Sequence, residues 1–399
     1  MGRIYVKRMR VLTFLFVSSL YLGLSSSSNT EKRLLTDLFN GYDTQLKPVK
    51  NYTDDIIVGV QMFPFLIREV DERLQTFSTS LWIGYNWKDE NLMWNSSNYD
   101  GITGLRVNID KIWIPGICII NELTDKKCLN FDEKGMAFLI YNGFVYYLKP
   151  FESTIQCKLD VTAYPFDEQI CTYIFYPYSN IAHDFGYSAN MTGFDLTFFE
   201  KNEEWEVLST SKSFPLDDRM PGSVVRTARL NVILKRRPSY VIINIFIPIF
   251  ILSVLNLLSF LLPIESGEKM GMVLAIFLTF AVFVTLISDS MPKSSVNLSM
   301  FGNYVAGQLI ISGLTIILET IVIKIYFKEY TPAAESRDDH SFHKYFHNNQ
   351  GSDSYDADRW KRFAVKLERY FCAFIVLATI ATIIYLILGV TVMRRTVTQ

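Results

Sequence analysis

Four apolar runs in the second half of the chain constrain its fold more than any other feature. They cover residues 240–263, 270–287, 304–327 and 371–392. At ~1.5 Å per helical residue, each run is about long enough to cross the ~30 Å hydrocarbon core of a bilayer. A chain that is 49% hydrophobic and 20% charged is too apolar for one soluble domain and too charged for membrane helices throughout. We therefore expect a soluble part followed by a membrane part.

The amino terminus has the layout of a secretory signal peptide over residues 1–28. Basic residues come first, an apolar run over 11–24 follows, and four serines end the segment. This run is too short to span a bilayer comfortably, so we expect the region that follows it to be exported. Glycosylation sequons at Asn51, Asn95 and Asn190 agree with an extracellular location.

Residues 29–237 show mostly strand patterns. Leu105, Val107 and Ile109 alternate with polar residues, as in a strand with one buried face. Short runs of this kind, punctuated by Gly, Pro, Asn and Asp, favour an antiparallel β-sandwich. The only clear helical pattern in this region covers residues 30–39.

The cysteines are concentrated in the same exported region. It holds four of the five, namely Cys118, Cys128, Cys157 and Cys171. Disulfide bonds are the default state of cysteines in an oxidising compartment. Cys372 lies in the last apolar run and is expected to be a free thiol.

The second apolar run carries an unusual stripe of small residues with acidic ends. Steps of three and four residues place seven positions on one face of a helix: Glu268, Gly271, Ala275, Leu278, Val282, Thr285 and Asp289. The bulk of the segment lies on the other faces. A narrow face with a carboxylate at each end suits the lining of a pore. An ordinary membrane helix whose charged ends reach the two interfaces is the alternative.

Several classes of function have no support in the sequence. The net charge is −1 and there is no long basic cluster, which argues against nucleic-acid binding. No glycine-rich phosphate loop, nucleophile elbow or pair of catalytic carboxylates stands out. Histidines in the polar linker after the third run are better explained as solvated loop residues than as metal ligands. We therefore predict no enzyme, no catalytic residue, no cofactor and no metal site.

The stretch from Cys157 to Cys171 is the most specific motif. Thirteen residues separate the two cysteines, and Tyr164, Pro165, Phe166 and Asp167 form an aromatic-Pro-aromatic-Asp turn between them. This stretch resembles the signature loop of the Cys-loop receptors, the pentameric neurotransmitter-gated ion channels. The tryptophans Trp87, Trp94 and Trp113 resemble those of nicotinic subunits in order and spacing. Arg236, shortly before the first apolar run, resembles the arginine that joins the two domains of the family.

The resemblance implies a multi-domain membrane protein, with an extracellular antiparallel β-sandwich followed by a four-helix transmembrane bundle. We expect a signal peptide over 1–28, the ligand-binding sandwich over 29–237, and three membrane helices within 238–327, at about 240–263, 268–290 and 304–327. A cytoplasmic loop with an amphipathic helix follows over 328–369, then a fourth membrane helix over 370–393 and an extracellular tail over 394–399. Residues 359–369 hold five basic residues and one acidic residue, as expected on the cytoplasmic side.

The resemblance also assigns roles to residues. It implies a Cys157–Cys171 disulfide whose loop, with Arg236, couples the sandwich to the membrane helices. Cys118 and Cys128 are a possible second pair that the family pattern does not require. In the second helix, Glu268 and Asp289 would set ion selectivity, Leu278 and Val282 would form the gate, and Gly271, Ala275 and Thr285 would line the pore.

The ligand-binding residues fit the nicotinic pattern only in part, which suggests a non-alpha type of subunit. Trp87, Tyr141 and Tyr147 are candidates for the complementary side of a binding site. On the principal side, Ile120 stands where a tyrosine is expected, and Tyr178 where a tryptophan is expected. We therefore expect that acetylcholine does not bind at the principal face of this chain.

The predicted function is that of one subunit of a cation-selective, neurotransmitter-gated channel in the plasma membrane, at a synapse or elsewhere on a neuron. Its partners would be a small-molecule transmitter of unknown identity, related subunits in a homo- or hetero-pentamer, monovalent cations and the lipid bilayer. The alternative is an accessory or poorly conducting subunit, or a membrane-anchored binding protein. An adhesion protein on the same sandwich is a more distant third.

Overall fold

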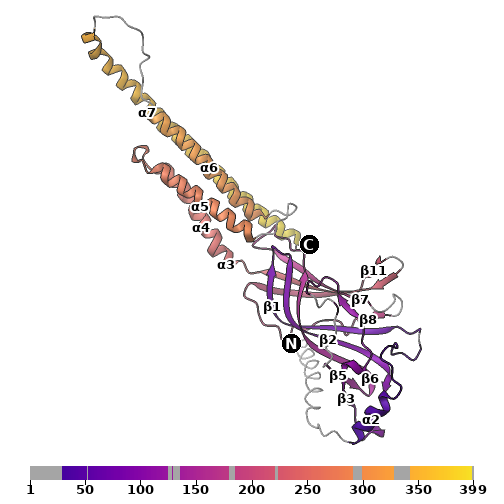
Figure 1. Cartoon of the computed structure of the whole chain (residues 1–399). Helices are drawn as coiled ribbons and strands as arrows, with labels where there is room; N and C mark the ends of the chain where they lie inside the picture. The colour runs from indigo at the N-terminus through magenta and orange to yellow at the C-terminus, as the bar shows by residue number, and fades with distance from the viewer. Residues whose placement is uncertain are drawn as a thin grey trace, which may run out of the picture.

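The structure is a computed structural model that describes residues 29–397, apart from 52, 125–127, 129–134, 179–184, 221–222, 291–298 and 328–341. The predicted signal peptide lies outside the described residues. An amino-terminal β domain is followed by a bundle of long helices, and Figure 1 shows the two parts end to end. The expected order of a sandwich before a four-helix bundle is confirmed.

The β domain follows a helix, α2 (Asn29–Phe39), where the sequence predicts one. Its larger sheet has the strand order β3-β5-β6-β2-β1-β8, with β9 also paired to β1. The bounds are β1 Ile56–Asp71, β2 Thr76–Met93, β3 Gly104–Asn108, β5 Met136–Ile140, β6 Asn142–Gln156, β8 Phe185–Tyr187 and β9 Gly193–Phe194. Most pairs are antiparallel, but β8 and β9 join β1 in parallel.

The second sheet has the order β10-β13-β7-β4. Its bounds are β4 Ile117–Ile119, β7 Glu168–Pro177, β10 Trp205–Ser213 and β13 Ala228–Arg236, and a separate hairpin holds β11 Leu216–Met220 and β12 Ser223–Arg226. Along β13 every second side chain, from Ala228 to Arg236, is buried. This period of two is the reason that the alternating sequence forms a strand with one face on the core.

Among the described residues, four helices are long and apolar enough to cross a membrane, over Ser239–Leu261, Lys269–Ser288, Met300–Tyr326 and Arg359–Gly389. The first comprises α3 (Ser239–Val241), a π-helical turn and α4 (Ile247–Leu258). Pro248 has no backbone N–H to donate to the preceding turn, and a π turn accommodates such a gap. The other three spans belong to α5 (Lys269–Ser290), α6 (Met300–Tyr326) and α7 (Phe342–Val397).

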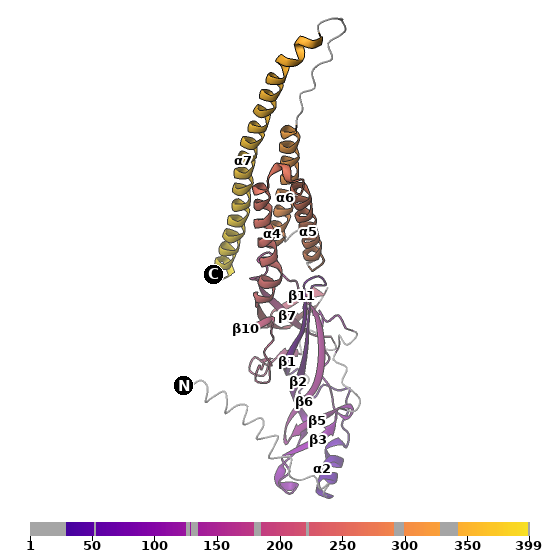
Figure 2. The same ribbon diagram turned by 90° about the vertical axis from the view of Figure 1, so that its left-hand side faces the viewer.

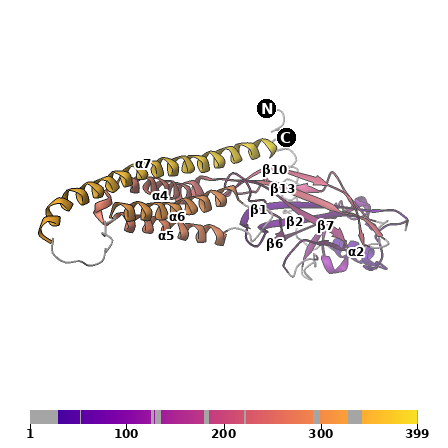
Figure 3. The ribbon, with the colours of Figure 1, turned by 90° about the horizontal axis from the view of Figure 1, so that it is seen from above.

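The last helix is longer than the sequence suggests. The amphipathic pattern predicts a helix from about residue 358, and a tail from residue 394. Instead, α7 is continuous from Phe342 to Val397. No proline interrupts this segment, so the helical backbone can pass from the amphipathic part into the membrane part without a break. Figure 3 shows α7 running along one side of the other helices.

Candidate functional site: pore helix, coupling loop and ligand face

The predicted pore stripe forms one exposed face of α5. Gly271, Ala275 and Thr285 are exposed. Leu278 and Val282 are 62% and 56% exposed, and a Cβ atom added at Gly271 would meet no atom within 4 Å. The opposite face packs into the bundle through Val273, Ile276, Phe280 and Ile287, all buried. The side chain of Asp289 lies outside the described residues.

The arrangement of the described helices leaves this face of α5 uncovered. The main contacts of α5 are with α4 and α6, and Lys269 at its start also contacts Glu368 of α7. Figure 2 shows α7 and α5 on opposite sides of the bundle, with α4 and α6 between them. Glu268 directly precedes α5, and its carbonyl oxygen accepts a hydrogen bond from the Met272 amide at 3.0 Å. Its side chain is exposed, and α5 begins at the end of the bundle remote from the β domain (Figure 1).

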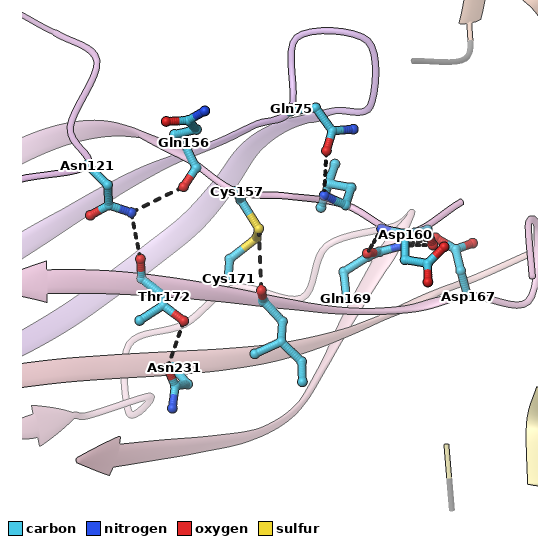
Figure 4. Close-up of a disulfide and its surroundings, with 12 residues drawn as sticks. Gln75, Asn121, Gln156, Cys157, Asp160, Asp167, Gln169, Cys171, Thr172 and Asn231 are labelled. Atoms are coloured by element: carbon cyan, nitrogen blue, oxygen red, sulfur yellow. Dashed lines mark hydrogen bonds between the residues drawn. A yellow bond between two sulfur atoms is a disulfide. The ribbon is translucent and has the colours of Figure 1, made fainter. Parts of the chain in front are cut away.

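The signature loop is closed by a disulfide between Cys157, which follows β6, and Cys171 in β7. The Gln169 side chain holds the loop together from inside. Its amide nitrogen donates to the Asp160 carbonyl at 2.8 Å, and its Oε1 accepts from the Asp160 amide at 2.8 Å. Figure 4 shows this bridge beside the disulfide. The Tyr164–Pro165 peptide bond in the turn is cis.

Arg236, the last residue of β13, lies at the centre of a buried ion cluster. Its Nε donates to Asp167 Oδ1 at 2.9 Å and its Nη1 to Glu204 Oε1 at 3.0 Å, and a third contact reaches Glu72. The rings of Trp205 and Tyr164 lie 4.2 and 4.9 Å from the guanidinium carbon. Burial alone would lower the pKa of Arg236, but hydrogen bonds and charges from Asp167 and Glu72 raise it above its ordinary value. Arg236 is therefore a fixed positive charge that holds four segments together.

The same loop contacts the start of α6, the third membrane helix. The Met300 amide donates to the Thr162 carbonyl at 3.1 Å, and the ring of Tyr164 lies 6.3 Å from that of Phe301. Phe301 in turn lies 6.2 Å from Phe246 in the first membrane helix. Burial raises the pKa of Tyr164 to about 12, so this ring remains a neutral apolar contact at neutral pH. Pro165 is buried, whereas Phe166 is exposed.

The prediction that Trp87 and Tyr147 bind a ligand is wrong, because both side chains lie in the core. Trp87 is fully buried and packs edge-on against Trp113 at 6.3 Å, and Tyr147 is only 2% exposed. A ligand cannot reach either ring. The reason is the register of β2 and β6, in which Trp87 and Tyr147 point to the inner face. Tyr141 and Tyr178, by contrast, are exposed.

Trp82 is the exposed tryptophan of β2, and no sequence motif singled it out. Trp82 is 40% exposed, and its ring packs edge-on against Phe65 at 5.0 Å. Leu148 on β6 is also exposed and lies close to Gly84 of β2. Exposed apolar side chains therefore extend from β2 onto β6. Trp82 and Trp87 differ by an odd number of positions, so a strand must point them to opposite faces. Strand alternation could therefore have identified Trp82.

The loop that follows Trp113 is closed by a second disulfide, between Cys118 and Cys128. The sequence left this pairing open. Glu122 within the loop is buried and accepts hydrogen bonds from the Ser153 hydroxyl at 2.5 Å and the Thr154 amide at 2.8 Å. These bonds fix the loop to β6. Ile120 is exposed at the position where the nicotinic pattern has a tyrosine.

The sequon asparagines Asn51, Asn95 and Asn190 are exposed, so a glycan could be attached at each. Asn95 also caps a short 3₁₀ helix by accepting a hydrogen bond from the Ser97 amide. Glycosylation at these positions stays a prediction.

A buried carboxyl group ties the amino-terminal segment to the sandwich. Asp89 is fully buried, and it accepts hydrogen bonds from the Tyr42 hydroxyl at 2.5 Å and the Asn91 amide at 2.9 Å. The Tyr42 oxygen in turn accepts from the Trp113 amide at 2.9 Å. Burial raises the pKa of Asp89 to about 6 from its ordinary 3.8, although the hydrogen bond from Tyr42 opposes the shift.

The free energy of unfolding should therefore fall as the pH rises from about 4 to about 6. In that window the folded chain holds a proton on Asp89 that the unfolded chain has lost, so raising the pH favours unfolding. At ~1.4 kcal/mol per pKa unit, the loss is about 3 kcal/mol. We expect Asp89→Asn to remove this slope in thermal melts of the purified receptor. An unchanged slope in the variant would assign the pH dependence to other groups.

Comparison with known proteins identifies the family. Residues 31–238 match the profile of the neurotransmitter-gated ion-channel ligand binding domain, and residues 245–352 match that of the transmembrane region. The neuronal acetylcholine receptor subunit alpha-3 of Bos taurus is 29% identical over 313 residues, which are 78% of this chain and 63% of that protein. The alpha-6 subunit of Homo sapiens is 29% identical over 303 residues, 76% of this chain and 61% of that protein.

An invertebrate relative matches about as well. The acetylcholine receptor subunit beta-type acr-2 of Caenorhabditis elegans is 28% identical over 310 residues, 75% of this chain and 51% of that protein. The chain thus spans less than two thirds of the length of these curated relatives. The ligand-binding profile alone covers more than half of the chain. The chain therefore belongs to the neurotransmitter-gated ion-channel family, the Cys-loop receptors, which are multi-pass plasma-membrane receptors and not enzymes.

Proposed function

We propose that this chain is one subunit of a cation-selective channel that opens when a small-molecule transmitter binds to its extracellular part. The observation that carries the proposal is the exposed stripe on α5. Leu278 and Val282 are large apolar residues, yet both remain exposed in the part of the chain that the structure describes. Five copies of this face around one axis would make a lumen with a ring of Glu268 at its inner mouth and apolar rings halfway along.

One α5 helix cannot enclose a pore, so function requires assembly. The family resemblance supports a pentamer, made from this chain alone or with related subunits. Transmitter binding between neighbouring sandwiches would shift a closed-open equilibrium. The loop around Tyr164, held by Arg236, would pass this shift to α6 through Met300 and Phe301.

The charge selectivity of the current tests the proposal. A ring of carboxylates at a narrow mouth creates a field that favours cations. We expect reversal potentials that follow sodium and potassium, and a marked loss of cation permeability in Glu268→Gln. Glu265→Gln is the matched control, because that nearby carboxylate already accepts a hydrogen bond from Tyr326 at 2.5 Å. Wild-type reversal potentials that follow chloride would overturn cation selectivity.

We place the agonist contact of this chain on its complementary face. Trp82 and Tyr141, both exposed, are the aromatic residues that we assign to this face. The principal face lacks an aromatic cage, since Ile120 replaces a ring. The segment over 214–226 contains no cysteine and only one aromatic residue, Phe214, which stacks on Tyr187 at 6.3 Å. We therefore propose that another subunit supplies the principal face.

Replacing Trp82 with alanine and replacing Trp87 with alanine should have different effects on the receptor. With a partner subunit present, Trp82→Ala is expected to raise the agonist concentration for half-maximal current by about tenfold, because an exposed aromatic contact worth ~1.4 kcal/mol is lost. Trp87→Ala should instead lower the number of receptors at the surface, because it empties a core position. The chain expressed alone should give no current with acetylcholine. Robust currents that vanish with Tyr178→Ala would contradict the assignment of the faces.

An accessory subunit that conducts poorly is the second candidate. It is favoured by Gly271 and Ala275, which depart from the polar residues usual in nicotinic pores below the gate. Single-channel recording of mixed assemblies separates the two functions. An accessory subunit lowers the unitary conductance of its partner's channel, and Gly271→Ser/Ala275→Thr should then raise it.

A further inference from the structure

A buried ion cluster joins three membrane helices at the inner end of the bundle. Lys269, the first residue of α5, places its ammonium 2.9 Å from Glu319 Oε2 of α6 and in contact with Glu368 of α7. The side chains of Lys269 and Glu319 are 1% and 0% exposed, and that of Glu368 is 13% exposed. The ammonium also lies 5.8 Å from the centre of the Phe260 ring.

Burying these charges is costly, so their placement needs a reason. An ionised group inside a protein destabilises the fold unless partners compensate it, and a hydrophobic replacement of similar size is often as stable. Stabilisation of the fold therefore does not explain well why these three charged residues are buried together. The cluster does, however, keep the positive charge of Lys269 away from the exposed surface at the start of α5.

The proposed selectivity residue, Glu268, lies at this same start of α5. Glu268 immediately precedes Lys269 and continues the helical hydrogen bonding of α5. Successive residues of a helix differ by about 100° in direction. Holding Lys269 towards α6 and α7 therefore keeps Glu268 turned out of the bundle, where it is exposed. A lysine without partners has a flexible stem of four carbons and could reach the same mouth.

We propose that Glu319 and Glu368 are positioning residues that hold the Lys269 ammonium away from the inner mouth of the pore, so that the Glu268 carboxylates alone set its potential. The inference rests on the proposed channel function. A ring of free lysines beside a ring of glutamates would cancel much of the field that concentrates cations.

The test compares two sets of substitutions in the full-length chain, assembled with its partner subunit where one is required. Glu319→Leu/Glu368→Leu removes both partners of Lys269, and we expect the single-channel conductance for sodium to fall by about twofold or more. Adding Lys269→Met to this pair removes the freed charge and should restore the conductance to near the wild-type value. A purely structural role predicts no recovery in the triple variant, because both ion pairs remain absent.

Surface labelling shows whether each variant reaches the membrane. If the Glu319→Leu/Glu368→Leu variant does not, Glu319→Leu is measured instead, since it leaves Glu368 as a partner. A smaller fall in conductance, reversed by Lys269→Met, is then expected. Equal conductances with and without Lys269→Met, in a wild type that is cation-selective, would overturn the inference. An anion-selective wild type would defeat the proposed function itself, so the two failures are distinguishable.

Discussion

Replacing Leu278 with serine is expected to lower the agonist concentration for half-maximal current by about tenfold or more, or to leave the channel open without agonist. A ring of branched apolar side chains can stop ions by excluding water from a narrow lumen. Leu278 is exposed on the proposed lumenal face of α5, so its ring would contribute this barrier in the closed state. A hydroxyl group would wet the ring and favour the open state. Each tenfold shift corresponds to about 1.4 kcal/mol.

The matched control for this variant is Leu377→Ser. Leu377 is as exposed as Leu278, but it belongs to α7, on the opposite side of the bundle from α5 (Figure 2). If Leu278 acts through the lumen, only Leu278→Ser should shift the response. Equal shifts in the two variants would mean that the serine acts on helix packing or lipid contact, and the gate would then have to be sought elsewhere.

The architecture was predictable because its determinants are local. The four apolar runs, the alternation along β3 and β13 and the spacing of the signature loop are each contained in a short stretch of sequence. Features that depend on pairing between distant segments were not predictable. The parallel addition of β8 and β9 to β1 is one example. The helical backbone of α7 before residue 358 was not predictable for a different reason, since its polar sequence carries no helical periodicity.

The candidate sites follow the same division. The pore stripe is a periodicity within one helix, so the sequence located it. The ligand face depends on which side of β2 points outwards, and a choice made on residue type alone selected Trp87 instead of Trp82. The Arg236 cluster assembles residues from positions 72, 167 and 204. Sequence separations of this size leave no local signal, and of the three carboxylates only Asp167 was anticipated, through the family motif.

Replacing Arg236, at the centre of this cluster, is the second substitution for which we expect a large effect. Removing the charge in Arg236→Met would leave the buried Asp167 without its partner. Glu72 and the more exposed Glu204 would lose the same partner. Breaking a buried ion pair from one side typically costs about 3–5 kcal/mol. We therefore expect few receptors at the cell surface, and loss of agonist-evoked current in those that arrive. Surface labelling combined with agonist binding measures the two effects separately.

Two further variants decide whether Arg236 acts by charge alone. Arg236→Lys keeps the charge but loses the planar fork that reaches Asp167 and Glu204 at once and the stacking on Trp205, so only partial recovery is expected. Lys235→Met is the matched control, because the exposed ion pair of Lys235 with Glu168, at 3.7 Å, is worth at most about 1 kcal/mol. If Arg236→Met responded like Lys235→Met, the buried cluster would be dispensable for folding and coupling. If Arg236→Lys restored the full response, a single positive charge would be sufficient at the junction between the sandwich and the membrane helices.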